Sequence, residues 1–418
     1  MLDRTNHPCF DDSARHRYAR VHLPVAPRCN IQCGFCDRRM DCLNESRPGV
    51  TSSVLSPGQA LHYLEQVVSE VSDLSVVGIA GPGDPFAQPE VTLETLRRVR
   101  ERFPDLLLCV ASNGLAVAPF ADRLAELSTS HVTITMNAFT AEVGSKIYTW
   151  VRVGRRVYRG AEAAEVLIAK QMEAVQALVE RGVTVKVNTI MIPGINDREV
   201  PLIARRAAEL GAHVHNVMPL FPVAGTPLGA VKAPTPAQLK VVRAEAARHL
   251  PQMSHCARCR ADAVGRLGQD SKEADVLRLR RAANLPLEPG EIRPHIAVAS
   301  REGVLINEHL GEATQLWVYE ATPTGQVLME TRATPAAGGQ RGRWLELASR
   351  FRDCRIIATS GAGGTPRGIL AECGIDIVVA EALIDDALRQ LFAGEPLRAP
   401  HRESRCGEGC SGTGQGCG

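Results

Sequence analysis

The chain has 418 residues, of which 44% are hydrophobic and 22% charged, and its formal net charge is +2. This composition is that of an ordinary globular protein, and it gives no electrostatic reason to expect binding to nucleic acid or to an anionic membrane. The length predicts two domains.

Neither a membrane span nor an export signal is predicted. No apolar run reaches the roughly 18–20 residues needed to cross a bilayer, and the N-terminus lacks a signal-peptide pattern. The 13 Cys residues are odd in number, so metal binding or catalysis is a better explanation for them than disulfides. We therefore expect a cytoplasmic protein in a reducing, low-oxygen compartment.

Apolar runs of strand length alternate with segments of helical periodicity up to about residue 250. The predicted strands are Val21–Ala26, Ser75–Ala80, Leu106–Ala111, His131–Asn137, Val183–Ile192 and His213–Leu220. The predicted helices include Gly58–Val71, Val91–Arg102, Ala161–Arg181 and Asp197–Leu210. Ser56 and Thr235 each begin a capping box with proline at the first helical position. This α/β order predicts a partial (β/α)6 barrel, with its site at the carboxyl ends of the strands.

The alternation of side chains along each strand predicts a polar barrel interior. In the first strand Val21 and Leu23 face the helices, so His22 faces the interior. The same rule places further polar side chains inside on the fourth and fifth strands, namely Thr133, Thr135, Asn137, Lys186 and Asn188. Cys109 and Asn113 share one side of the third strand. An interior this polar predicts a bound ligand.

A second, smaller α/β domain is predicted after a linker. The proposed limits are residues 1–285 for the first domain, 286–293 for the linker, 294–398 for the second domain and 399–418 for a tail rich in Gly and Cys. The elements expected in the second domain are strands at Ile296–Ser300, Gly303–Ile306, Gln315–Glu320, Arg355–Thr359 and Ile375–Ala380, and a helix at Ile384–Phe392. The tail residues Cys406, Cys410 and Cys417 could hold iron or zinc.

Two other features of the second domain are expected to be structural. The stretch from Ser360 to Gly364 lacks the full dinucleotide fingerprint, so a plain strand-to-helix turn is favoured over a phosphate loop. Cys354 and Cys373 are interpreted as core thiols.

Cys29, Cys33 and Cys36 follow the first predicted strand with the spacing Cys-x3-Cys-x2-Cys. Three thiolates can hold three corners of a [4Fe–4S] cluster, and the missing fourth ligand leaves one iron open. A zinc loop is the alternative. With Phe35 before the last Cys, the loop resembles the signature of the radical S-adenosylmethionine (SAM) superfamily. The resemblance implies that the open iron chelates SAM and that reductive cleavage releases a 5′-deoxyadenosyl radical.

Further loops would contact SAM if this resemblance holds. Gly81, Gly83 and Asp84 follow the second strand, where glycine lets the backbone approach the methionyl amine. An ordinary strand-to-helix turn is the alternative. The other expected contacts to SAM are Ser112, Asn113, Asn188 and Pro193.

Six soft donors remain in the first domain, and they divide into two sets of three. They are Cys9, His22, Cys42, Cys109, Cys256 and Cys259. A lone strand cysteine such as Cys109 is more often a small core residue, whereas the Cys256-x2-Cys259 pair is harder to explain in that way. Two sets of three could hold two further [4Fe–4S] clusters, each with an open iron.

Long runs between about residues 5 and 285 resemble the NifB family of nitrogenase cofactor-maturation proteins. The runs include His7-Pro8-Cys9, Asp41 to Val50, Gly78 to Pro85, Lys186-Val187-Asn188, Ile192 to Asp197 and His255 to Gly268. The second domain resembles the NifX/NafY-type modules that bind nitrogenase cofactor precursors, which implies a ribonuclease-H-like fold. The tail matches no family pattern.

The resemblance implies fusion of two [4Fe–4S] clusters into the [8Fe–9S–C] precursor of the FeMo-cofactor. One SAM would methylate a cluster sulfide, and a second would supply the radical that abstracts hydrogen from that methyl group on the way to a carbide. The implied ligands are Cys29, Cys33 and Cys36 for the SAM-cleaving cluster, His22, Cys42 and Cys109 for one substrate cluster, and Cys9, Cys256 and Cys259 for the other. Glu45 is a plausible further ligand.

The implied partners are SAM, iron–sulfur cluster donors, carrier or scaffold proteins of nitrogenase assembly, and a reductant protein. Two other functions stay open on the residues alone. One is a different radical SAM maturase with auxiliary clusters, and the other is a non-catalytic iron–sulfur scaffold or carrier.

Overall fold

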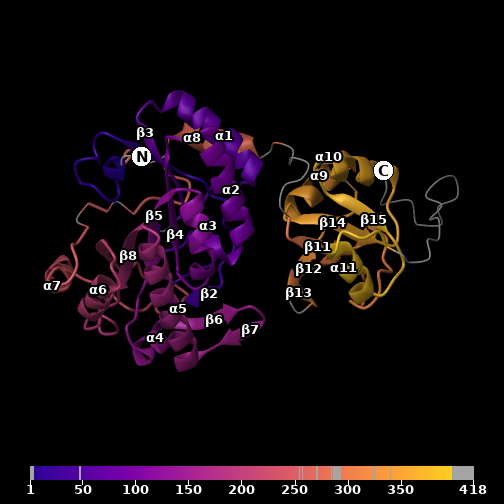
Figure 1. Cartoon of the computed structure of the whole chain (residues 1–418). Helices are drawn as coiled ribbons and strands as arrows, with labels where there is room; N and C mark the ends of the chain where they lie inside the picture. Colours follow the sequence, from indigo (N-terminus) through magenta and orange to yellow (C-terminus); the bar gives the residue numbers. More distant parts are fainter. Residues whose placement is uncertain are drawn as a thin grey trace. The chain divides into compact units, whose positions relative to one another are not determined.

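The computed structural model describes residues 4–46, 49–253, 255–256, 258–269, 272–283, 285, 293–322, 325–338 and 340–397. The chain divides into two compact units, the first ending at Leu285 and the second beginning at Pro286 (Figure 1). The predicted tail and all of the predicted linker except Arg293 lie outside the described residues. Among the helices of the described ranges, none is long and apolar enough to cross a membrane.

A seven-stranded sheet with the order β10-β1-β3-β4-β5-β8-β9 forms the first unit. Its strands are β1 (Ala19–His22), β3 (Leu74–Ile79), β4 (Leu107–Ser112), β5 (Thr129–Thr135), β8 (Thr184–Met191), β9 (Val214–Pro219) and β10 (Val264–Gly265). All neighbours pair in parallel except β10, which is antiparallel to β1. The predicted partial barrel of six parallel strands is confirmed, and β10 is an addition that its two-residue length hid.

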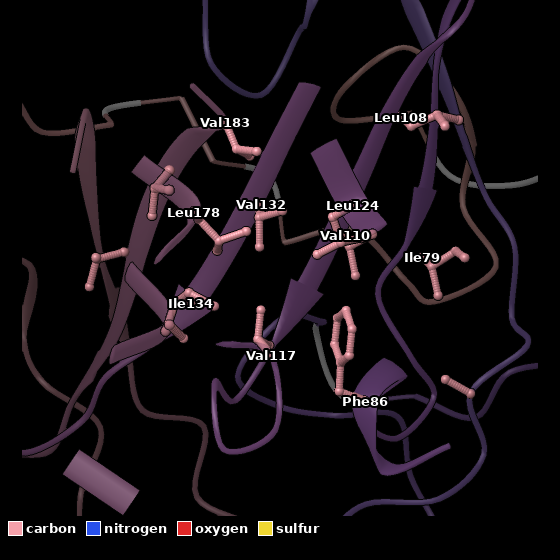
Figure 2. Close-up of a cluster of buried hydrophobic side chains, with 14 of the residues drawn as sticks. Ile79, Phe86, Leu108, Val110, Val117, Leu124, Val132, Ile134, Leu178 and Val183 are labelled. Atoms are coloured by element: carbon pink, nitrogen blue, oxygen red, sulfur yellow. The ribbon is translucent and has the colours of Figure 1, made fainter. Parts of the chain in front are cut away.

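Helices cover the outer face of this sheet. They are α1 (Pro57–Glu70), α2 (Pro89–Arg102), α3 (Ala121–Glu126), α5 (Gly160–Glu180), α6 (Val200–Glu209), α7 (Pro236–Ala246) and α8 (Glu273–Ala283). A further helix, α4 (Ala141–Ile147), packs on α5. The predicted capping boxes are present at Ser56 and Thr235. Figure 2 shows how Val132 and Ile134 of β5 pack in one cluster with Leu124 and Leu178 of the helices. The alternate side chains of β5 therefore face the barrel interior.

A small second sheet fixes the cysteine loop. It consists of β2 (Ile31–Cys33), β6 (Tyr148–Val153) and β7 (Arg156–Tyr158), and the β6–β7 hairpin lies beside α4 and α5 (Figure 1). β2 pairs antiparallel with β6. The Gly34 N–H donates to Ile147 O at 2.6 Å. The sequence did not predict this sheet, because its strands are short and the hairpin is largely exposed.

The second unit is a five-stranded mixed sheet with the order β13-β12-β11-β14-β15. Its elements are β11 (His295–Val298), β12 (Gln315–Thr322), β13 (Gly325–Ala333), α9 (Gln340–Arg350), β14 (Cys354–Thr359), α10 (Gly364–Glu372), β15 (Asp376–Val379) and α11 (Ile384–Phe392). β11, β14 and β15 are parallel, whereas β12 and β13 are antiparallel. This unit is thus the mixed α/β domain that was predicted.

One predicted strand of the second unit is wrong. Gly303–Ile306 makes only an isolated bridge, between Leu305 and Leu383. Val304 and Leu305 are 56% and 41% exposed, so their apolar side chains do not mark a buried strand. The stretch that begins at Ser360, after β14, leads into α10, whose N-cap is Gly363. Cys354 is fully buried in the core.

Candidate functional site

The three thiols of the cysteine loop border one cavity of about 850 Å³, here called the loop cavity. Its wall includes Cys29, Cys33, Cys36, Cys42, Asp84 and Asn113. Phe35 is 1% exposed and anchors the loop in the core. Gln32 Nε2 donates to Cys33 O at 3.1 Å and to Cys36 O at 2.7 Å, which fixes the turn between these cysteines.

Amide donors point at two of these thiols. Asn113 Nδ2 lies 3.7 Å from Cys29 Sγ, and Asn44 Nδ2 lies 3.6 Å from Cys33 Sγ. Burial raises the pKa of all three thiols, in Cys36 to about 11. The thiols are therefore protonated in the metal-free chain at neutral pH, and binding of iron must displace protons.

Asp84 ties together the loops that follow β3 and β4. Its carboxylate accepts the Asn113 N–H at 2.6 Å, the Phe86 N–H at 2.9 Å and the Ser112 hydroxyl at 3.1 Å. Burial nevertheless raises the pKa of Asp84 to about 6. This carboxylate therefore shapes the wall of the loop cavity by positioning Asn113.

The residues expected to contact SAM are only partly gathered. Asp84 and Asn113 line the loop cavity, and the backbone of Gly83 packs so closely that an added Cβ would lie 2.1 Å from Arg28 O. Gly81, Gly83 and Ser112 stand next to lining residues without lining the cavity themselves. Asn188 lines a different cavity, and Pro193 borders neither.

That different cavity, here called the barrel cavity, has a volume of about 640 Å³. It brings together five of the six remaining soft donors, namely Cys9, His22, Cys109, Cys256 and Cys259. Glu45 also lines it. The two cavities adjoin along the segment from residue 42 to residue 45, because Cys42 and Asn44 line one and Glu45 lines the other.

Cys42 is the donor that the structure places elsewhere. It lines the loop cavity, where its backbone N–H donates to Pro82 O at 2.8 Å. Arg258 holds the next residue by donating to Leu43 O at 2.7 Å. The expected set of His22, Cys42 and Cys109 is thus divided between the cavities, because these backbone contacts fix the loop.

The protonation and orientation of the His22 ring suit a metal ligand. Its Nδ1 lies 2.9 Å from Arg260 O, and because a carbonyl can only accept, Nδ1 carries the proton. Burial lowers the pKa of His22 to about 4, so the ring is neutral at pH 7. Nε2 therefore keeps a lone pair, the arrangement common in metal-bound histidine. Gly78 leaves room for the ring, since a Cβ there would lie 2.8 Å from His22 Cδ2.

The other donors are also held in place. Arg20 is 1% exposed, and its guanidinium donates to Cys259 Sγ at 3.0 Å. The Cys9 N–H donates to His7 Nδ1 at 3.1 Å. Burial and the nearby Cys259 raise the pKa of Cys9 to about 12. Glu45 accepts from the Thr135 hydroxyl and, at 2.8 Å, from Asn188 Nδ2, while burial raises its pKa to about 7.

The sequence reasoning missed Arg20, Asn44 and Arg258. Arg20 could have been found, because it lies two residues before His22 on the same strand and so faces the same side. Asn44 lies in a loop, and Arg258 acts on carbonyls at Leu43 and Pro219 that are distant in sequence. No local pattern predicts such contacts.

The donor chemistry fits iron–sulfur clusters. Within the described ranges, no three His, Cys, Asp or Glu side chains converge closely enough to hold a single metal ion. The ligands of a [4Fe–4S] cluster bind different irons, so they need not converge on one point. Four thiols on the wall of the loop cavity, and four thiols with the neutral imidazole of His22 on the wall of the barrel cavity, are compatible with such groups.

Comparison with known proteins identifies the family. Residues 23–207 match the radical SAM superfamily, and residues 293–394 match the dinitrogenase iron-molybdenum cofactor family. The FeMo cofactor biosynthesis protein NifB of Chlorobaculum tepidum is 48% identical over 421 residues, which cover 100% of this chain and 99% of that protein. The chain belongs to the NifB family. NifB of Klebsiella pneumoniae is 42% identical over 402 residues, covering 88% of this chain and 86% of that protein.

Membership of the NifB family makes this a radical SAM protein of FeMo-cofactor biosynthesis, which implies SAM and a [4Fe–4S] cluster. Among solved structures, methylornithine synthase is 16% identical with a TM-score of 0.38, covering 63% of this chain and 81% of that chain. SuiB of Streptococcus suis bound to S-adenosylmethionine is 14% identical with a TM-score of 0.41, covering 56% and 50%.

Proposed function

We propose that this NifB-family protein fuses two [4Fe–4S] clusters, with a SAM-derived carbide and a ninth sulfide, into the [8Fe–9S–C] precursor of the FeMo-cofactor. The main support is the barrel cavity. It carries five soft donors, whereas one further cluster with an open iron requires only three. It also adjoins the cavity of the cysteine loop.

The cysteine loop would hold the resident cluster, which supplies the electron for reductive cleavage of SAM. Asn113 and Asn44 would donate hydrogen bonds to its thiolates, and such donors stabilise negative charge on sulfur. Asp84 would keep Asn113 in this position by holding its backbone N–H. These residues orient the reaction and do not exchange atoms in it.

The substrate clusters would bind in the barrel cavity. Cys9, Cys256 and Cys259 would hold one of them. His22 and Cys109 would hold the other, with a third ligand from the 42–45 segment, either Cys42 or Glu45. One SAM would methylate a substrate sulfide. A second SAM would give the 5′-deoxyadenosyl radical, which takes a hydrogen atom from that methyl group.

Residues 1–285 would then form the catalytic domain, and the second domain, residues 294–398, would hold the product. The proposed partners are proteins that deliver iron–sulfur clusters, a protein that supplies the electron, and carriers or scaffolds that accept the product. The match of residues 293–394 to the dinitrogenase iron-molybdenum cofactor family supports this division.

Anaerobic incubation with SAM and dithionite tests the proposal. We expect 5′-deoxyadenosine, S-adenosylhomocysteine and an eight-iron product. The Cys33→Ala variant should form none of them while keeping the substrate clusters, and Cys373→Ala, far from both cavities in sequence and located in the second unit, is the control. A scaffold would form neither nucleoside product. A different radical SAM maturase would form 5′-deoxyadenosine without an eight-iron product.

A further inference from the structure

A buried lysine lies among the candidate ligands of both substrate clusters. Lys186, on β8, is 8% exposed and lines the barrel cavity together with Cys9, Cys109 and Cys256. Its ammonium lies 5.0 Å from the centre of the Phe10 ring. Within the part of the chain that the structure describes, the ammonium makes no hydrogen bond and no ion pair.

The other two cations of this cavity wall are already engaged. Arg20 donates to Cys259 Sγ and to the carbonyls of residues 265 and 266. Arg258 donates to Pro219 O at 2.9 Å and to Leu43 O at 2.7 Å. Among the described residues of this wall, Lys186 is therefore the cation whose charge remains available to a bound group.

The wall around Lys186 carries groups of both expected ligand sets. Cys9 and Cys256 belong to one set, Cys109 belongs to the other, and Glu45 lines the same wall. The ammonium therefore shares one cavity with both sets.

We propose that Lys186 is a positioning residue that keeps two anionic substrate clusters together by placing a positive charge between them. This inference rests on the proposed function. Each thiolate adds negative charge to the cluster it holds, and two such groups repel strongly in a cavity of low dielectric constant. A buried ammonium reduces that repulsion, and the bound anions in turn compensate an otherwise costly buried charge.

The test uses the anaerobically purified full chain with its clusters reconstituted. In Lys186→Met we expect bound iron to fall by about one cluster and the eight-iron product to fall roughly tenfold or more. The EPR signal of the SAM-cleaving cluster and the formation of 5′-deoxyadenosine should persist. Lys186→Arg should recover most of the iron and product, because the charge is restored. Lys170→Met, which removes an exposed lysine of α5 paired with Glu173, is the matched control.

Two results would overturn the inference. The first is a Lys186→Met protein that binds as much iron as the unmodified chain and forms product at the same rate. The second is a Phe10→Leu protein with the same loss of iron, because Lys186 would then act by holding the N-terminal arm. If the unmodified chain makes no eight-iron product, the proposed function fails, and the iron content of Lys186→Met still decides whether Lys186 retains the clusters.

Discussion

At the scale of single residues, His22 is the nitrogen donor among the expected cluster ligands of the barrel cavity, whereas His7 of the same wall uses its Nδ1 to accept the Cys9 N–H. The Nδ1–H of His22 is held by Arg260 O, so Nε2 has its lone pair available. A neutral imidazole should exchange from iron more easily than a thiolate when clusters fuse. We expect His22→Ala to keep the SAM-cleaving cluster, to weaken one substrate cluster and to lower product yield, as measured by iron content and EPR.

The variant His22→Cys separates binding from exchange. It should restore cluster occupancy more than it restores fusion, because a thiolate holds iron more tightly than imidazole does. If His22→Ala forms the eight-iron product at the unmodified rate, His22 only lines the cavity.

Asp353 joins His295 and Arg332 through its carboxylate in the second unit. It accepts hydrogen bonds from His295 Nδ1 at 3.0 Å and from both terminal nitrogens of Arg332, at 2.6 and 3.0 Å. Although burial works to raise its pKa, these contacts hold the pKa of Asp353 well below its usual range. A carboxyl group with a depressed folded-state pKa stabilises the fold above its unfolded pKa of about 3.9, and this contribution is lost as the pH falls through the folded-state value.

We therefore expect Asp353→Asn to lower the free energy of unfolding of the second unit by about 2–3 kcal/mol at pH 7. The difference from the unmodified chain should shrink as the pH falls below about 4. Urea titration followed by the fluorescence of Trp317 and Trp344 measures this. Asp386→Asn, whose partner Arg389 is exposed, should change the stability by less than about 0.5 kcal/mol. A pH-independent loss in Asp353→Asn would show that packing, not charge, is responsible.

The sequence predicted single residues where strand alternation applies. His22, Thr133, Lys186 and Asn188 line the barrel cavity, as the alternation requires. Cys42 could not be placed in this way, because it lies in a loop fixed by Pro82 and by Arg258. Side chains on regular strands have an orientation that the sequence encodes, whereas loop side chains depend on distant partners.

At the scale of elements, the loop after β3 is fitted tightly against the loop after β1. The Gly83 N–H donates to Ala26 O at 2.5 Å, and a Cβ on Gly83 would lie 2.1 Å from Arg28 O. Gly83→Ala must therefore separate the two loops that border the loop cavity. We expect SAM affinity, measured by equilibrium dialysis, to fall roughly tenfold or more, because a displaced loop no longer holds the wall of the loop cavity in position.

The control for this variant is Gly368→Ala. Gly368 lies in α10, and a Cβ there would contact nothing within 4 Å. The Gly368→Ala variant should leave SAM binding unchanged and slightly stabilise α10. Unchanged SAM affinity in Gly83→Ala would mean that the loop can move without affecting the site.

Elements with strong periodicity were predictable and exposed elements were not. The six parallel strands and the helices α1, α2, α5 and α6 were found because each buries one apolar face. β13 was missed because its apolar residues Val327, Leu328 and Met329 are consecutive and do not alternate with polar ones, and because none of its side chains is fully buried. Gly303–Ile306 was wrongly assigned to a strand because exposed Val304 and Leu305 imitate a buried run.

At the scale of the whole molecule, every expected cluster ligand belongs to the first unit, which ends at Leu285. The end of this unit is well anchored. Gln59 Nε2 of α1 donates to Ala283 O at 3.1 Å and to Leu285 O at 2.8 Å. The apolar core behind the barrel is likewise formed from residues 21–282 alone. The first unit thus has its own core and its own cavities.

A chain that ends near residue 290 should therefore fold and convert its paired clusters. We expect 5′-deoxyadenosine and the eight-iron product at rates close to those of the full chain, because no group on either cavity wall is removed. The product should leave the shortened chain more readily on gel filtration, and adding the second unit as a separate protein should recover part of the retention. Loss of SAM turnover in a shortened chain whose circular dichroism shows a folded first unit would contradict this division of labour.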